Sequence, residues 1–193
     1  KQLLAFAGGG QTGVAPTQAS ELVEETVRLL LAVVTQHATV DLHLADNLPT
    51  IEADQVQLRQ VVMNLMTNAA DAIGEHDGQI IVRTKMMSLS RSDLQDCFLG
   101  ETLLPGDYVA IEVGDTGAGM DAATLKRIFD PFFSTKEYGH GLGLAAVLGI
   151  VRTHGGALKV NSSPGSGTTF TILLPPLVGI RHGDRSISNR TAA

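Results

Sequence analysis

The sequence predicts an α/β domain in which a mixed sheet is covered by helices on one face. The first observation is the order of helical and strand-like patterns, α-β-α-β-β-α-α-β-β. The second is a composition of 44% hydrophobic and 18% charged residues, which argues against intrinsic disorder. The third is the length of 193 residues. A single domain of that size buries roughly 70% of its unfolded surface.

Two amphipathic helices dominate the first half of the chain. Apolar residues at helical spacing predict one helix over residues 18–38 and another over 54–75. Asp54 is expected to cap the second helix, because Asp accepts hydrogen bonds from the free N–H groups of a first turn. Alternation of apolar and polar side chains predicts a strand over Val40–Leu44 between the two helices.

The second half of the chain is predicted to contain four strands, two helices and a polar excursion that carries a short helix. Asp121 is expected to cap the first of these helices, and a pair of glycines ends the second. The strands are expected over 79–86, 107–113, 157–162 and 168–174, the helices over 121–129 and 144–154, and the excursion over 88–106. Pro164–Gly167 indicates a hairpin turn between the last two strands.

Less regular segments flank the predicted domain, which is expected over residues 18–176. Residues 1–7 are typical of the last turns of a helix that begins upstream. Three glycines follow, and the stretch up to Pro16 indicates a flexible linker, so that 1–17 lies outside the domain. Residues 177–193 are polar and are expected to form a flexible tail.

Charge and cysteine content exclude several classes of protein. The chain has 14 basic and 20 acidic residues, a net charge of −6, and no long basic run. Binding to nucleic acid or to a membrane surface is therefore not expected. The single cysteine, Cys97, excludes an internal disulfide and a cysteine-rich metal site. No apolar run is long enough to span a bilayer, and the composition predicts a soluble cytoplasmic unit.

Three polar side chains form a stripe along the helix predicted over 54–75. Asn64, Asn68 and Asp71 follow the spacing i, i+4, i+7 and therefore share one face. A solvated helix face is one interpretation. Asn is a mediocre helix former, however, and solvent-exposed faces usually take Glu, Lys, Arg or Gln. Two amide groups one turn apart can ligate a hard cation and hydrogen-bond phosphate oxygens.

Two glycine-rich motifs indicate close approach of the backbone to a ligand. Residues 115–120 read DTGAGM directly after a predicted strand, where a carboxylate can accept a hydrogen bond from an amino group. A plain turn is the alternative. Residues 139–144 read GHGLGL and open a helix whose free N–H groups can bind an anion. Their spacing differs from the dinucleotide-binding fingerprint, and the chain contains no Walker-type phosphate loop.

Phe129–Lys136 reads FDPFFSTK and places three of the six phenylalanines within five positions. One interpretation is a hydrophobic plug that closes an edge of the core. In the other, the rings anchor a hinged loop whose Lys136 can reach a phosphate. The two interpretations are compatible.

Together and in this order, the motifs resemble the boxes of the GHKL superfamily. The N box is similar to 60–73, the first glycine box to 115–120, the F box to 129–136, the second glycine box to 139–145 and the last box to 165–170. Over about residues 18–175, the likeness is strongest to the catalytic, ATP-binding (HATPase) domain of bacterial sensor histidine kinases, including hybrid kinases with a downstream receiver. The resemblance implies a two-layer α/β sandwich of the Bergerat type, with ATP and Mg²⁺ between the helices and a flexible lid.

The resemblance also implies roles for individual residues. Asn68 is similar to the Mg²⁺ ligand, and Asn64, Asn68 and Lys136 form the implied catalytic set. Asp115 is similar to the carboxylate that accepts the adenine amino group. The implied nucleotide-binding residues are Asn64, Asn68, Asp71, Asp115, Gly117, Gly119, Met120, Lys136, His140, Gly141, Leu142, Gly143, Leu144 and Thr168, with a lid at about 130–143.

The activity implied is transfer of the γ-phosphoryl group of ATP to a histidine on an upstream dimerisation domain, within a two-component phosphorelay. The implied partners are that domain and a response-regulator receiver, and the full-length protein is expected to be a homodimer. Membrane anchoring of the full-length protein is left open. Only His76 among six histidines precedes an acid, Asp77, and it falls in a predicted turn. The chain is therefore expected to lack its own phosphoacceptor.

Two other functions remain as alternatives. The first is an ATP-splitting enzyme of the same superfamily, in which a Glu lies one turn before the Mg²⁺ ligand. Asn64 occupies that position here, and an amide has no useful proton affinity near neutral pH, which disfavours hydrolysis. The second is a degenerate nucleotide-sensing module without transfer activity, which the intact boxes argue against.

Overall fold

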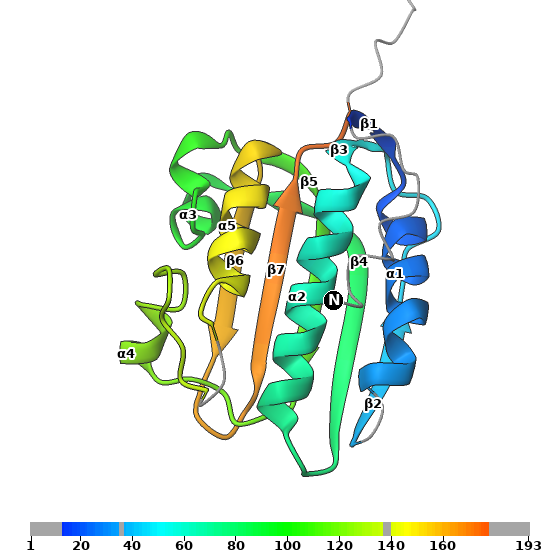
Figure 1. Cartoon of the computed structure of the whole chain (residues 1–193). Helices are drawn as coiled ribbons and strands as arrows, with labels where there is room; N and C mark the ends of the chain where they lie inside the picture. Colours follow the sequence, from blue (N-terminus) through cyan, green and yellow to red (C-terminus); the bar gives the residue numbers. More distant parts are fainter. Residues whose placement is uncertain (1–12, 35–36, 137–139, 178–193) are drawn as a thin grey trace, which may run out of the picture.

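The computed structural model describes residues 13–34, 37–136 and 140–177. Its elements are β1 (Val14–Thr17), α1 (Ala19–Val34), β2 (Ala38–His43), β3 (Ile51–Asp54), α2 (Gln55–Ile73), β4 (Gly78–Leu89), α3 (Arg91–Gln95), the 3₁₀ turn η2 (Gly100–Thr102), β5 (Gly106–Asp115), α4 (Ala122–Leu125), α5 (Gly143–Thr153), β6 (Ala157–Ser162) and β7 (Thr168–Leu174). The main sheet has the order β2-β4-β5-β7-β6 (Figure 1). Because β2 pairs with β4 in parallel and the other pairs are antiparallel, the predicted mixed sheet is confirmed.

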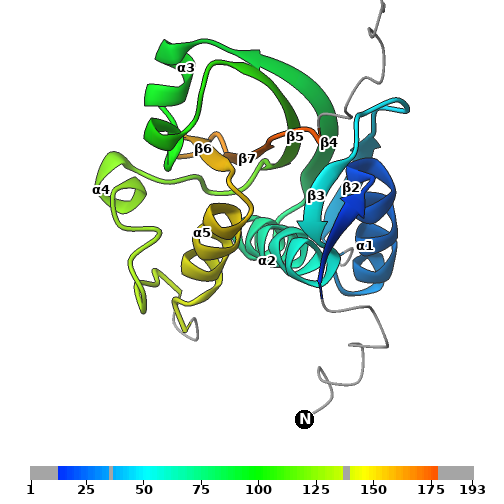
Figure 2. The same ribbon diagram turned by 90° about the horizontal axis from the view of Figure 1, so that it is seen from above.

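One face of the sheet is covered by α1, α2 and α5 (Figures 1 and 2). Successive side chains of a strand point to opposite faces, so Val82, Ile111 and Ile172 all point to the helical layer. They form the main core with apolar residues of the three helices, among them the fully buried Leu65 and Val147. This layer supports the floor of the candidate site.

The course of α2 follows from its sequence. The Asp54 carboxylate accepts hydrogen bonds from the N–H groups of Val56 (2.9 Å) and Gln57 (3.1 Å), which confirms the predicted cap. The helix ends at Ile73, because Gly74 adopts φ +64°. Its apolar stripe is buried against the sheet, which leaves the Asn64–Asp71 stripe on a different side of the helix.

Both ends of α5 are tied to α2 by hydrogen bonds. At the start of α5, the Asn64 side-chain amide donates to the Gly143 carbonyl at 3.3 Å. At its end, the Asp54 N–H donates to Nε2 of His154 at 3.0 Å. These contacts fix the first turn of α5 relative to the polar stripe of α2.

The three long helices share one face of the sheet, as the sequence predicts, and the short α3 is an addition on the other face. The excursion after β4 carries α3 and lies over the opposite face, as Figure 2 shows. Leu94 and Cys97 pack there against Tyr108 and Leu173, which point away from the main core. Those apolar strand residues need cover, and the excursion supplies it. Its few apolar residues have no clear period, so the sequence did not reveal this second small core.

The prediction of a linker up to Pro16 is wrong for residues 14–17, which form β1 and pair antiparallel with β3. Pro16 is tolerated because an edge strand does not need every N–H. The bridge between Pro176 and Ile51 adds the chain after β7 to the same small sheet. The expected helix end at 1–7, the glycines after it and the tail from 178 onward lie outside the described residues.

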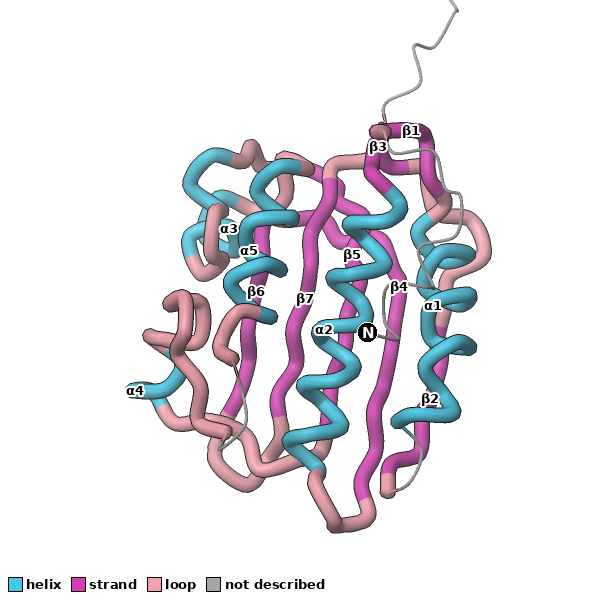
Figure 3. Tube along the Cα trace, in the orientation of Figure 1, coloured by secondary structure: helices cyan, strands magenta, loops and turns pink. Residues whose placement is uncertain are grey.

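The connection from β5 to α5 contains less helix than the sequence predicts. Of the helix expected over 121–129, only α4 forms, and the rest of the connection is mostly loop (Figure 3). A long loop beside the helical layer can shape a cavity. Among the helices that the structure describes, none is both long and apolar enough to cross a membrane.

Removing the cap of α2 should destabilise the domain. In Asp54→Ala, the N–H groups of Val56 and Gln57 lose their acceptor, and the free energy of unfolding should fall by about 0.5–2 kcal/mol in urea titrations. Asp46→Ala, at an exposed position, is the matched control and should change it by less than about 0.5 kcal/mol. Equal effects of the two substitutions would contradict the role of Asp54.

Candidate functional site

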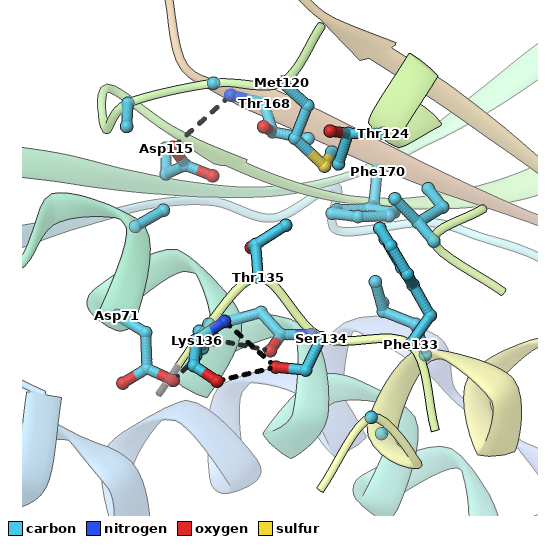
Figure 4. A pocket seen from close by; sticks show the side chains of 18 of the residues that line it. Asp71, Asp115, Met120, Thr124, Phe133, Ser134, Thr135, Lys136, Thr168 and Phe170 are labelled. Atoms are coloured by element: carbon cyan, nitrogen blue, oxygen red, sulfur yellow. Dashed lines mark hydrogen bonds and ion pairs between the residues drawn. The ribbon is translucent and has the colours of Figure 1, made fainter. Parts of the chain in front are cut away.

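A cavity of about 510 Å³ lies between α2, the end of β5, the start of α5 and the loop that connects β5 to α5. Figure 4 shows that Asp115, Thr168 and Met120 lie on one side of it and Asp71, Lys136 and Ser134 on the other. The lining residues are Asn68, Asp71, Ala72, Asp115, Ala118, Gly119, Met120, Thr124, Ile128, Phe133, Ser134, Thr135, Lys136, His140, Gly141, Leu142, Gly143, Leu144, Thr168 and Phe170.

Most of the site residues expected from the sequence share this cavity, although they come from distant parts of the chain. Asn64 and Gly117 do not line it. Asn64 instead contacts the first turn of α5, and Gly117 packs behind the wall against α2. The lining residues that were not expected from the sequence are Ala72, Ala118, Thr124, Ile128, Phe133, Ser134, Thr135 and Phe170. Ala72, one turn after Asn68, could have been found from helical spacing; Thr124 and Ile128 are brought in by the tertiary fold.

Asp115 dominates the β5 end of the cavity. Its Oδ1 accepts hydrogen bonds from the N–H groups of Gly117 (2.8 Å) and Thr168 (3.3 Å). Burial raises the pKa of the Asp115 carboxyl above its ordinary value, and these two N–H groups partly offset the rise. The carboxyl is thereby held in place while Oδ1 is engaged by the backbone.

Ser162 fastens the glycine-rich loop after β5 to the β6–β7 hairpin. Its hydroxyl accepts a hydrogen bond from the N–H of Met120 at 2.8 Å and donates to the carbonyl of Gly167 at 3.1 Å. It also lies 2.9 Å from the hydroxyl of Thr168. Met120 and Thr168 are therefore held together on the wall that carries Asp115.

Two glycines of this loop are required by close packing. A Cβ at Gly117 would lie 2.4 Å from the carbonyl oxygen of Ala72 on α2. A Cβ at Gly119 would lie 2.0 Å from the carbonyl oxygen of Ser163, and Gly119 has φ +66°. The glycine spacing in the motif thus reflects packing of the loop between α2 and the hairpin.

Lys136 dominates the opposite end of the cavity. Its ammonium donates to Oδ2 of Asp71 at 2.6 Å and to Oδ1 of Asn68 at 3.1 Å. The loop and the polar stripe of α2 therefore meet at this corner, which we call the Asn68–Asp71 corner.

The Asn68–Asp71 corner suits a hard cation. Its amide and carboxylate oxygens both accept hydrogen bonds from the ammonium of Lys136, so they already converge on one positive charge. No cluster of three or more His, Cys, Asp or Glu side chains suitable for a metal occurs in the described residues. Mg²⁺ is commonly held by one or two protein oxygens together with substrate phosphates, and the corner fits that arrangement.

The start of α5 faces the same end of the cavity. Leu142 precedes the helix and offers no side-chain cap, so the N–H groups of the first turn have no side-chain partner there. The turn before it is tight: Gly141 has φ +65°, and a Cβ at this position would lie 2.4 Å from the backbone of Phe132. The Phe132 N–H donates to the Gly141 carbonyl at 2.9 Å and joins the two sides of the loop.

The three phenylalanines of the F-rich motif have different surroundings. Phe129 packs against the main core and makes an edge-to-face contact with Phe98, with ring centroids 4.6 Å apart. Phe133 lines the cavity beneath the guanidinium of Arg127, 4.3 Å from the ring centroid. Phe132 is 78% exposed. The plug interpretation therefore describes Phe129, and the lining ring is Phe133.

Comparison with known proteins identifies the family. Residues 53–178 match the family model described as "Histidine kinase-, DNA gyrase B-, and HSP90-like ATPase". The chain belongs to this family. The match begins at the end of β3 and includes the whole cavity, so the GHKL resemblance of the sequence is confirmed.

The relatives of this ATPase-family domain include bacterial sensor kinases. It is 37% identical to "Sensor kinase CckA" of Brucella abortus over 186 residues, and 37% identical to "Signal transduction histidine-protein kinase AtoS" of Escherichia coli over 177. These matches cover 95% and 91% of the chain but only 19% and 26% of the relatives. They confirm the resemblance to the catalytic, ATP-binding domain of a bacterial sensor histidine kinase.

Solved structures agree with this assignment. Full-length ShkA in complex with AMPPNP superposes with a TM-score of 0.67 at 26% identity, over 88% of this chain and 32% of that one. The nucleotide-free catalytic domain of the histidine kinase ThkA gives a TM-score of 0.66 over 84% of this chain and 95% of that one. The predicted α/β fold is confirmed by these likenesses.

Opposite effects are expected from the same substitution at two glycines. Gly117→Ala should lower the free energy of unfolding by about 1–3 kcal/mol, because its Cβ would collide with the Ala72 carbonyl of α2. Gly149→Ala on α5 meets no atom within 4 Å and should raise it by about 0.5–1 kcal/mol. Urea titrations measure both, and wild-type stability of Gly117→Ala would contradict the packing described here.

Proposed function

We propose that the domain binds Mg-ATP and donates its γ-phosphoryl group to a histidine of an upstream dimerisation domain. The observation that carries the proposal is the difference between the two ends of the cavity, one with an acceptor and the other with donors. One end presents the held carboxylate of Asp115, and the other presents the ammonium of Lys136 and the uncapped start of α5. A ligand with an amino donor at one end and an anionic group at the other matches this arrangement.

Adenine is the proposed ligand of the Asp115 end. Oδ1 of Asp115 is engaged by two backbone N–H groups, so the carboxyl can turn its other oxygen to the exocyclic amino group of the base. Met120 and Phe170 supply apolar surface near it. A base with a carbonyl in place of the amino group would place its oxygen opposite the carboxylate oxygen of Asp115, and no hydrogen bond could form between these two acceptors.

The triphosphate is proposed to lie between α2 and the first turn of α5. The free N–H groups of that turn can donate to phosphate oxygens, and Lys136 can add an ammonium. Asn68 is the proposed Mg²⁺ ligand; bound Mg²⁺ would neutralise charge on the phosphates. His140, Leu142 and Leu144 belong to the same wall.

The side chains around the phosphate end favour transfer over hydrolysis. Hydrolysis needs a group that orients or deprotonates water. Asn64 is an amide, and its nitrogen donates to the Gly143 carbonyl, so it cannot act as a base. A site of this kind can hold ATP for a protein acceptor, because phosphoryl transfer depends mainly on positioning and charge neutralisation.

The wider context of the domain is also a proposal. Residues 14–177 are proposed as the catalytic domain, because β1 and the chain after β7 join its small sheet, with the preceding segment as the end of a dimerisation helix and a linker and the segment after 177 as a tail. The named sensor kinases among the relatives support a two-component role with a response-regulator receiver as the next partner. A homodimeric full-length protein with this domain in the cytoplasm is proposed on the same ground.

Transfer in trans tests the proposal. The domain is mixed with an upstream helical domain of the same protein and ATP labelled on its γ-phosphate. Label should appear on a histidine of the helical domain, and Asp115→Asn should reduce it at least about tenfold, because a hydrogen bond to a charged group is lost at the base. The domain alone should stay unlabelled.

The same reaction separates the alternatives. Free phosphate in place of labelled histidine would identify an ATP-splitting enzyme. Bound but unchanged ATP would identify a nucleotide-sensing module. Either result would contradict the proposed transfer.

Binding of adenosine should depend on pH through Asp115. Because burial raises the pKa of this carboxyl, it takes up a proton at a higher pH than an ordinary Asp, and affinity should fall as the pH is lowered through that pKa. Adenosine is used because it has no phosphate that titrates near neutrality. Calorimetry across neutral to mildly acidic pH measures the effect.

The control is Asp115→Asn, which should bind more weakly and without this pH dependence. Linkage predicts the opposite sign for stability: the raised pKa makes Asp115 stabilising at low pH, and that contribution is lost as pH rises through the folded-state pKa. A wild-type affinity profile that is flat, like that of the variant, would remove Asp115 from base recognition.

A further inference from the structure

The Asn68–Asp71 corner contains a positive charge supplied by the protein itself. Lys136 Nζ lies 2.6 Å from Asp71 Oδ2 and 3.1 Å from Asn68 Oδ1 (Figure 4). Asn68 Oδ1 is also the oxygen that the proposed function assigns to Mg²⁺. An ammonium and a divalent cation at one oxygen repel each other, so binding of either one there disfavours the other.

We propose that Asp71 is a positioning residue that latches the loop shut in the empty site, and that Lys136 and the metal exchange at the Asn68 oxygen when nucleotide binds. The exchange with the metal rests on the proposed function, whereas the latch in the nucleotide-free protein does not. Asp71 thereby acts on Lys136 and does not contact the nucleotide.

Local contacts couple the ammonium to the loop. Ser134 Oγ accepts a hydrogen bond from the Lys136 N–H at 3.0 Å and donates to the Lys136 carbonyl at 3.3 Å. Residues 134–136 therefore form one tight turn. Asp71 lies on α2, which is anchored in the core, so it cannot follow the loop when the loop moves. The ion pair is consequently a link between a helix anchored in the core and the loop between β5 and α5.

The latch is weak enough to open. The side chains of Lys136 and Asp71 are 41% and 48% exposed, and ion pairs this exposed contribute little free energy to holding a structure together. Breaking such a pair changes an equilibrium by up to about fivefold. A polyphosphate offers Lys136 a more strongly charged partner than Asp71 does, and the carboxylate itself repels the phosphates. Nucleotide binding can therefore drive the exchange.

Hydrogen exchange of the nucleotide-free protein tests the latch. The variants are Asp71→Asn, which keeps the shape of the side chain without its charge, Lys136→Met, and the double variant. Each single variant should accelerate exchange of the amides of residues 132–136 about two- to fivefold, and the double variant should be no faster than the faster single one. Lys126→Met, which removes an exposed charge next to α4, is the control and should match wild type.

Calorimetry with Mg²⁺ and a non-cleavable ATP analogue tests whether the metal replaces Lys136 at the Asn68 oxygen when nucleotide binds. Asp71→Asn should bind up to about fivefold more tightly than wild type, because no ion pair has to break and a repelling charge is gone. Lys136→Met should bind more weakly, because a phosphate partner is lost. The two ends of one ion pair would then have opposite effects, which a merely structural contact would not produce.

Four outcomes would overturn all or part of the inference. Wild-type exchange rates in Asp71→Asn would show that no latch exists, and additive effects of the two substitutions would show that the residues act separately. Weaker nucleotide binding by Asp71→Asn would show that Asp71 contacts the nucleotide or metal itself. Failure of every variant and of wild type to bind nucleotide would refute the proposed function and the replacement of Lys136 by the metal. The hydrogen-exchange rates of the amides would still decide whether the latch exists.

Discussion

The attachment of α5 to α2 is the constraint on which the site depends. One face of α2 is buried in the main core, and hydrogen bonds hold both ends of α5 to it. The Asn64 amide in the middle of α2 donates to Gly143 at the start of α5, and the N–H of the cap residue Asp54 donates to His154 at the end of α5. Because α2 also carries Asn68 and Asp71, these bonds set the separation between a polar helix face and a helix start with free N–H groups. A change in that separation would alter the Lys136 end of the cavity, even though Asn64, Asp54 and His154 do not line it.

The two ends of the cavity differ in their charged groups and in how far these groups are exposed to solvent. At the β5 end, burial works against the charge of Asp115 and raises its pKa, and the backbone N–H groups of Gly117 and Thr168 offset this only in part. At the other end, Lys136 balances Asp71 in a corner that remains partly open to solvent. A buried carboxyl needs fixed hydrogen-bond donors, whereas a solvent-exposed ion pair can rearrange at a small cost in free energy. The Asp115 end is therefore a wall fixed by backbone hydrogen bonds, and the Lys136 end is formed by a loop joined to α2 through an exposed ion pair.

The layer on the far side of the sheet is linked to this loop. Phe98 pairs with Leu158 at the β6 edge, with backbone bonds of 2.8 and 3.0 Å, and its ring meets Phe129 at the base of the loop. The excursion thus covers apolar strand residues, protects a sheet edge from unwanted pairing and supports the anchor of the loop at the same time. This explains why an irregular segment contains a tightly packed Leu94.

The sequence by itself determined the secondary elements with strong periodicity, the Asp54 cap, both strands of the last hairpin and the motif order that identifies the family. Those features are local, because spacing and capping depend on residues a few positions apart. Tertiary structure alone decided the pairing of β1 with β3, the side of the sheet that the excursion covers, and the difference between Phe129, Phe132 and Phe133. It also decided that Lys136 reaches Asp71 and that Asn64 turns to Gly143. Such contacts join residues far apart in the chain, and no local pattern specifies which partner a side chain will meet once the core has packed.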